Sequence, residues 1–230
     1  MTAPAIKQFP PLQSGDRLSM EDFERRYFAM PRVKKAELIE GEVLMGSPVH
    51  FIHHGRPHAA LQGWMFHYEV ATPGVAVGDN SSFRLDRKNQ FQPDIALCIL
   101  PDYGGRTRMG KKSIMDGSPE LVAEVAASSV SVDANRKLEV YLRNQVLEYM
   151  VWRTYDAELD WFSLRGGEYV PLPADPADGL LKSAVFPGLW LDCGALLKGD
   201  MTAVLAALNR GTASPEHAAF VQHLAARRTP

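Results

Sequence analysis

Two apolar, strand-like segments of the chain each carry a carboxylate within them. The first covers residues 91–100 and places Asp94 directly after a Gln-Pro pair; the second covers residues 119–126 and contains Glu124. A buried carboxylate is costly unless it is paired, hydrogen-bonded or bound to a metal ion. Two such segments therefore indicate a site in which Asp94 and Glu124 act together.

Carboxylates on two strands suit a divalent metal ion that serves phosphodiester hydrolysis. Mg²⁺ prefers oxygen ligands, usually one or two carboxylates together with waters and phosphate oxygens of the substrate. Bound Mg²⁺ or Mn²⁺ can activate water and offset the charge that develops on the phosphate and the leaving oxygen. We therefore predict that Asp94 and Glu124 are metal ligands on adjacent strands. The alternatives are a turn cap for Asp94 and a buried salt bridge for Glu124.

A lysine follows the second segment at a useful distance. Lys137 lies near the start of the helix expected directly after the Glu124 strand, so the chain can bring it back over the end of that strand. A lysine in that place can orient water or stabilise a charged transition state. The alternative is an ordinary surface ion pair with Asp133, four residues earlier on the helix.

The elements that must position these groups follow a mixed order. Patterns of apolar residues, caps and turn residues predict helices near 20–30, 53–70 and 133–145, a hairpin at 36–45, and strands at 75–85, 91–100, 121–127, 147–154, 159–164 and 168–172. A polar turn at 86–89 joins two of the strands, and a long polar loop covers 101–118. The order predicts an α/β fold, a mixed β-sheet flanked by helices.

The domain organisation is expected to be simple. Residues 1–17 form a flexible lead-in, residues 18–197 the main domain, and residues 198–230 a helical extension with two helices. The extension either forms a dimer contact or covers a sheet edge. Hydrophobic residues make up 46% of the 230 residues, which is enough for a packed core and excludes a disordered chain.

Charge and cysteine content limit the choice of partners and location. The formal net charge of -2 excludes binding of nucleic acid by bulk positive charge, so any such contact needs a local basic patch. Two cysteines, Cys98 and Cys193, are too few for a disulfide framework, and Cys98 is expected in the core. We see no segment suited to a membrane span or a signal peptide, so we expect a cytoplasmic protein without a membrane partner.

Two further groups of residues could contact a substrate. The loop at 104–112 combines three glycines with four cations, Arg106, Arg108, Lys111 and Lys112, and could bend around a phosphate backbone. A solvated loop is the alternative. His54 belongs to a histidine-rich stretch and is expected either near the site or in a hydrogen bond at the start of a helix.

At these residues the chain resembles the PD-(D/E)XK nuclease superfamily. The closer resemblance is to a bacterial family of small restriction-endonuclease-like proteins formerly classed as a domain of unknown function. The matching segments, in chain order, are residues 37–43, 47–48 with 54–55, 92–94, 121–125, 136–138 with Tyr141, 146–152 and 187–189. Each segment alone is weak evidence for the family, but the order and spacing of the segments from about residue 19 to residue 197 are specific for it.

The resemblance implies roles for individual residues. Asp94 and Glu124 would hold Mg²⁺ or Mn²⁺, and Lys137 would be the catalytic lysine, which in this family has moved from the strand to the next helix. The sequence agrees, because Ala126 stands where a standard E-x-K motif has its lysine. Glu37 matches an acidic residue of the first strand and would join the catalytic group, unless it merely faces solvent.

The function implied is that of a metal-dependent endonuclease that hydrolyses DNA phosphodiester bonds. A homodimer is expected by analogy with nucleases that cut both strands. The main alternative is a catalytically inactive binding or regulatory protein that kept the nuclease fold. A second is a different hydrolase with two carboxylates, such as a glycosidase.

Overall fold

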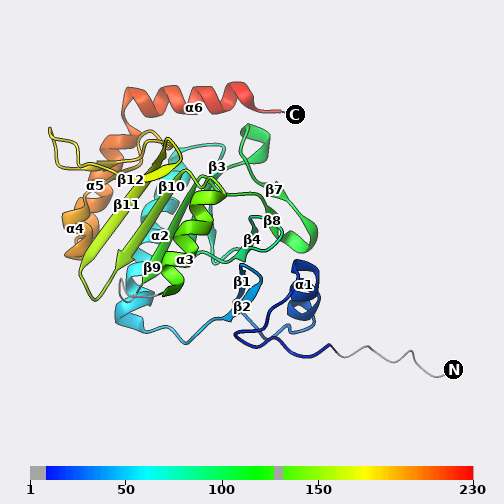
Figure 1. The fold of residues 1–230 in the computed structure, drawn as a ribbon. Helices are drawn as coiled ribbons and strands as arrows, with labels where there is room; N and C mark the ends of the chain where they lie inside the picture. The colour runs from blue at the N-terminus through cyan, green and yellow to red at the C-terminus, as the bar shows by residue number, and fades with distance from the viewer. Residues whose placement is uncertain (1–8, 127–131, 230) are drawn as a thin grey trace.

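The computed structural model describes residues 9–126 and 132–229, which form two six-stranded sheets and one two-stranded sheet with flanking helices (Figure 1). The expected fold class, a mixed α/β protein with helices on its sheet faces, is confirmed. The prediction of a single sheet is wrong, because the strands divide between two large sheets.

The central sheet lies between helices. Its strands run in the order β12 (Glu168–Pro171), β11 (Glu158–Arg165), β10 (Glu148–Arg153), β9 (Leu121–Ala126), β6 (Ile95–Ile99) and β3 (Val75–Asp79). β9 and β10 are parallel and are connected through α3 (Val132–Arg143), whereas the other neighbours are antiparallel. A parallel pair needs such a crossover connection, which places α3 on one face of the sheet.

Alternation along β9 shows how both faces are covered. Leu121 and Val125 pack in one core cluster with Trp64 of α2 (Arg56–Ala71), whereas Val122 packs in another with Tyr141 of α3. Successive strand residues point to opposite faces, so α2 and α3 lie on opposite sides of the sheet. Figure 1 shows this arrangement, with α3 in front and α2 behind.

The peripheral sheet is built of short strands. Their order is β2 (Glu42–Met45), β1 (Ala36–Ile39), β5 (Gln90–Phe91), β4 (Phe83–Arg84), β8 (Met115–Asp116) and β7 (Arg108–Met109). Glu40 and Gly41 both have positive φ and close the predicted hairpin of β1 and β2. The loop expected at 101–118 in fact contains β7 and β8, together with the short helical turns η2 (Pro101–Tyr103) and η3 (Lys111–Ser113).

Between residues 75 and 99 the chain crosses from one large sheet to the other and back, and this corrects two predicted strands. The strand expected at 75–85 divides into β3 and β4, and the one expected at 91–100 divides into β5 and β6. The breaks have local causes: Asn80 adopts a positive φ, and Pro93 lacks the N–H that a continuous ladder needs. The second crossing carries Asp94 into the junction between the sheets.

The remaining helices agree well with the sequence. α1 (Met20–Phe28) lies within the helix predicted near 20–30 and begins after Ser19, whose hydroxyl accepts from the Asp22 N–H. α2 is preceded by a π-helical turn, η1 (Phe51–Gly55). α4 (Cys193–Leu197), α5 (Met201–Thr212) and α6 (Pro215–Arg227) end the described chain, and β13 (Leu181–Lys182) pairs with β14 (Trp190–Leu191).

Both ends of the described chain pack against the main domain. Residues 12–17 differ from the expected flexible lead-in, because Leu12 is buried and the Gly15 N–H donates to the Val43 carbonyl. Val204 and Leu224 of the C-terminal helices join the same core cluster as α2. Cys98 is buried, as predicted. Among the helices described, none combines the length and the hydropathy that a bilayer crossing requires.

Candidate active site

The strand register places Asp94 opposite Glu124. β6 and β9 pair in antiparallel register up to Ile95 and Ala123, so one further step brings the two carboxylate residues face to face. Beyond that pair of residues, hydrogen bonds between side chains and the backbone take the place of the backbone–backbone bonds. The Val125 N–H donates to Asp94 Oδ2 at 2.9 Å, and the Asp94 N–H lies 3.4 Å from Glu124 Oε2. Each carboxylate is therefore fixed by the backbone of the opposite strand.

Helix α3 brings two groups onto Glu124. Lys137 Nζ lies 3.3 Å from Glu124 Oε1, and the Tyr141 hydroxyl donates to the same oxygen at 2.9 Å. Residues four apart on a helix lie on one face, so one turn of α3 delivers both groups. The Lys137 side chain is only 13% exposed, which is far from the surface position of the alternative prediction. The Asp133 side chain, its proposed surface partner, lies outside the described residues.

Glu37 connects the peripheral sheet to this group. Its carboxylate accepts from Lys137 Nζ at 2.9 Å and from the Gln92 N–H at 2.8 Å. The Glu37 side chain is buried, so it is not the solvent-facing strand residue of the alternative prediction. Glu37 and Glu124 therefore hold Lys137 between β1 and β9.

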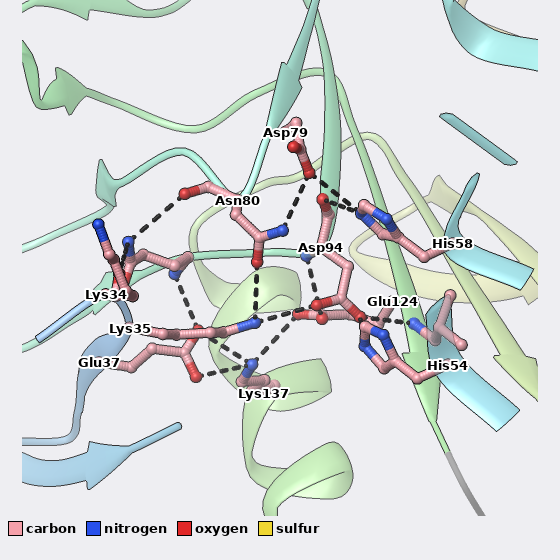
Figure 2. Close-up of polar contacts among 12 residues, drawn as sticks. Lys34, Lys35, Glu37, His54, His58, Asp79, Asn80, Asp94, Glu124 and Lys137 are labelled. Carbon is pink, nitrogen blue, oxygen red and sulfur yellow. Dashed lines mark hydrogen bonds and ion pairs between the residues drawn. The ribbon is translucent and has the colours of Figure 1, made fainter. Parts of the chain in front are cut away.

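Asp94 has two cationic or potentially cationic neighbours of its own. Lys35, which directly precedes β1, places Nζ 3.0 Å from Asp94 Oδ1, and His54 Nε2 lies 3.1 Å from Asp94 Oδ2. Figure 2 shows Lys35, Lys137 and His54 converging on the two carboxylates. His58, one turn after His54, bonds instead to the Asp94 carbonyl and to Asp79.

A cavity of about 260 Å³ is lined by the charged and polar side chains of Lys35, Glu37, His54, Asp94, Glu124 and Lys137. Its wall also includes residues of β2, β9 and β10, among them Leu44, Val125, Ala126 and Val151. The carboxylate residues Asp94 and Glu124 are 3% and 8% exposed, whereas the side chains of Lys35 and His54 are 29% and 23% exposed. Solvent therefore reaches the buried carboxylates past Lys35 and His54.

Burial and pairing shift the pKa values of the site in different directions. Burial alone would raise the pKa of Asp94, but the hydrogen bond from His54, the charge of Lys35 and the Val125 N–H hold it below its ordinary value. Burial raises the pKa of Glu124, against the opposing charge of Lys137. Burial lowers the pKa of Lys137, but Glu124 and Glu37 outweigh it and raise the value, so Lys137 is a cation at neutral pH.

The donor set fits a divalent ion of the Mg²⁺ type. Among the side chains that the structure describes, no three of the types His, Cys, Asp or Glu are grouped so as to hold an ion by themselves. Mg²⁺ does not need such a cage, because it commonly uses one or two carboxylates and fills its other positions with water and phosphate oxygens. Asp94 and Glu124 offer that pair of carboxylates, and a metal there would compete with Lys35 and Lys137 for them.

The basic loop lies apart from the cavity. Its cations are Arg106, Arg108, Lys111 and Lys112, and they do not belong to the cavity wall described above. Arg106 donates to the Gln145 carbonyl, and Lys112 Nζ lies 4.0 Å from the centre of the Phe28 ring. Lys111 lines a separate surface hollow beside α1. The structure thus brings His54 to the site but not the four cations of the loop.

Sequence reasoning missed Lys35 and gave Tyr141 no role in the site. A signal for Lys35 was available, since it stands two residues before Glu37 and therefore points to the same side of an extended chain. For Tyr141 the signal was its spacing of four residues from Lys137. Neither signal shows that the partner carboxylate lies within reach, because that depends on the pairing of β6 with β9.

The fold and the arrangement of this cavity define a restriction-endonuclease-like protein. A solved structure described as a "putative nuclease belonging to DUF820", from Anabaena variabilis, has the same fold. It matches with a TM-score of 0.56 and 12% identity over 76% of this chain and 96% of that chain. No curated protein matches the chain. The family model of Uma2, described as "Putative restriction endonuclease", matches residues 20–194, so the chain belongs to this family.

Proposed function

We propose that the protein is a metal-dependent endonuclease that hydrolyses DNA phosphodiester bonds in the cavity of Asp94 and Glu124. The observation that carries the proposal is the meeting of these carboxylates, from opposite positions of two strands, with Lys137 in a water-accessible cavity. Membership of the restriction-endonuclease family supports the same chemistry.

Asp94 and Glu124 would hold Mg²⁺ or Mn²⁺, which supplies an activated water and offsets charge on the phosphate. Lys137 would stabilise the negative charge that develops on the phosphate. This role suits Lys137 better than proton abstraction. Its pKa is raised, so the side chain is an ammonium cation, which has no lone pair to accept a proton. His54 would orient Asp94 through the bond between Nε2 and Oδ2.

Glu37 and Tyr141 are best explained as positioning residues. Glu37 holds the Lys137 ammonium with both carboxylate oxygens, and Tyr141 fixes one oxygen of Glu124. Hydrogen bonds from neighbouring residues of this kind keep a metal-binding or charge-stabilising side chain in its working orientation. The basic loop at 104–112 could contact the phosphate backbone away from the scissile bond, and a homodimer would allow both strands of a duplex to be cut.

Incubation with supercoiled plasmid tests the proposal. The wild-type protein should nick or linearise the plasmid with Mg²⁺ or Mn²⁺ and should stop when EDTA removes the metal. Glu124→Gln and Lys137→Ala proteins, shown by circular dichroism to be folded, serve as controls. Equal nicking by all three proteins, or nicking that persists in EDTA, would refute the assignment.

A further inference from the structure

The cavity holds two lysines where the proposed reaction needs one. Lys35 and Lys137 each lie against a carboxylate, Lys35 on Asp94 at 3.0 Å and Lys137 on Glu124 at 3.3 Å. Both lysines form ion pairs with these carboxylates, and both therefore occupy oxygens that a metal ion would use.

The two lysines differ in how firmly they are held. Lys137 has a second carboxylate partner, Glu37, and its side chain is 13% exposed. Lys35 has Asp94 as its carboxylate partner among the described residues, with the Asn80 side-chain oxygen 3.5 Å away, and its side chain is 29% exposed. A metal ion on Asp94 would therefore release Lys35, whereas Lys137 would remain on Glu37.

The released lysine would stay at the opening of the cavity. Its position before β1 is fixed by the neighbouring Ala36 N–H, which donates to the Gln92 side chain at 3.0 Å. Its flexible stem carries three ammonium donors that can turn toward a new anion. The phosphodiester that enters the cavity is the anion that the proposed reaction supplies.

We propose that Lys35 changes partners during the reaction, from Asp94 in the metal-free protein to the phosphate of the bound strand. This inference depends on the proposed nuclease function and adds a residue to its substrate contacts. Lys35 neutralises Asp94 until metal binds, and it then contacts a non-bridging oxygen of the scissile phosphate. Metal and nucleic acid consequently bind cooperatively, because each removes a cost of binding the other.

Calorimetry with Mn²⁺ alone tests the first half of the exchange. Lys35→Met, which keeps the stem but removes the charge, should bind Mn²⁺ about 5- to 20-fold more tightly than wild type, because a competing cation is gone. Lys35→Arg should bind Mn²⁺ within about threefold of wild type, and so should Lys34→Met, a change at the exposed neighbouring lysine.

Binding of an oligonucleotide in Ca²⁺, with fluorescence anisotropy as the readout, tests the second half. Lys35→Met should bind the strand about 5- to 20-fold more weakly than wild type, and added Ca²⁺ should strengthen binding less than it does in wild type. The Lys34→Met protein should behave as wild type in both respects.

The outcomes separate this inference from the proposed function. If wild type binds Mn²⁺, Asp94→Ala abolishes that binding, and Lys35→Met binds no more tightly than wild type, the role of Lys35 is refuted while the metal site stands. Unchanged oligonucleotide binding by Lys35→Met refutes the phosphate contact. If wild type does not bind Mn²⁺ at all, both the proposed function and the exchange of Lys35 are refuted.

Discussion

Two buried glutamates on neighbouring strands of the central sheet have very different surroundings. Glu124 on β9 is paired with Lys137, accepts from Tyr141 and lines the cavity. Glu148 on β10 is fully buried and lies among neutral donors. The four donors are the Ser183 hydroxyl, the Trp161 indole N–H and the backbone N–H groups of Ala184 and Val185.

The comparison separates a structural carboxylate from a candidate catalytic one. Glu148 uses its oxygens to fix the turn at 183–186 against the sheet, because three of its four donors come from that turn and the fourth is Trp161 of β11. Glu124 collects partners from a helix and from the opposite strand, beside open space. Burial of a carboxylate thus demands partners, but only charges converging on a solvent-accessible cavity indicate chemistry.

The largest expected difference between the two residues is in cleavage. Glu124→Gln should lower the rate of plasmid cleavage on the order of 10³-fold, because the metal loses a charged ligand and the phosphate loses compensation. Glu148→Gln should cleave within about threefold of wild type at a temperature where it is folded. Cleavage rates in Mg²⁺ measure both effects, and a similar loss in the two variants would show that Glu124 and Glu148 do not differ in their roles.

Glu148→Gln should instead lower stability, by about 1–3 kcal/mol in the free energy of unfolding, because the amide NH₂ meets donors that need an acceptor. Urea denaturation measures this quantity. The Glu124→Gln protein provides the comparison, since its charge loss falls in the cavity. Stability of Glu148→Gln equal to that of wild type would show that the turn at 183–186 does not depend on Glu148.

The stability loss at Glu148 should also depend on pH. Burial raises the pKa of Glu148 from 4.5 to about 7, although its four donors oppose the shift. The Glu148 carboxyl group therefore stays protonated to a higher pH in the folded protein than in the unfolded chain. As a result, the contribution of Glu148 to the free energy of unfolding falls as pH rises from about 4.5 to about 7. The difference between wild type and Glu148→Gln should therefore be larger at pH 5 than at pH 8. An equal or larger difference at pH 8 would contradict this.

Removal of the Tyr141 hydroxyl should have a smaller effect on the site. Tyr141→Phe keeps the ring in its core position but deletes the bond to Glu124, so cleavage should fall by about 10-fold. A matched control is Tyr169→Phe. The hydroxyl that it removes donates to the Val146 carbonyl, outside the cavity. Equal cleavage by the two variants would argue that Glu124 does not need Tyr141 for its orientation.

The smallest effect is expected at the basic loop. A protein with Lys111→Ala and Lys112→Ala should bind DNA with a salt dependence lower by less than about two ion equivalents, since each phosphate contact contributes about one. Titrations at several salt concentrations measure this slope. No change in the slope would exclude these two lysines from the DNA contact, whereas a loss of cleavage in the absence of a binding defect would contradict their remote position.

Local patterns in the sequence determined much of the architecture. Period-two and helical spacing identified the strands of the central sheet and the helices α2, α3 and α5. Side-chain hydroxyls of Ser19 and Ser214 cap α1 and α6, which are also local interactions. These features depend on residues close together in the chain, so short-range physics is sufficient. The same reasoning wrongly joined β3 to β4 and β5 to β6. In each pair the two strands belong to different sheets, and which sheet a strand joins depends on partner strands that lie far away in the sequence.

The site followed the same division. The residue types at 94, 124 and 137 suggested metal chemistry, and their spacing required only that two strands be adjacent. Whether they are adjacent is decided by the register of β6 against β9, a contact between residues about 30 apart. Lys35 reached Asp94 across 59 positions of sequence. Such pairings depend on packing of the whole chain, and so only the tertiary structure decided which charges share the cavity.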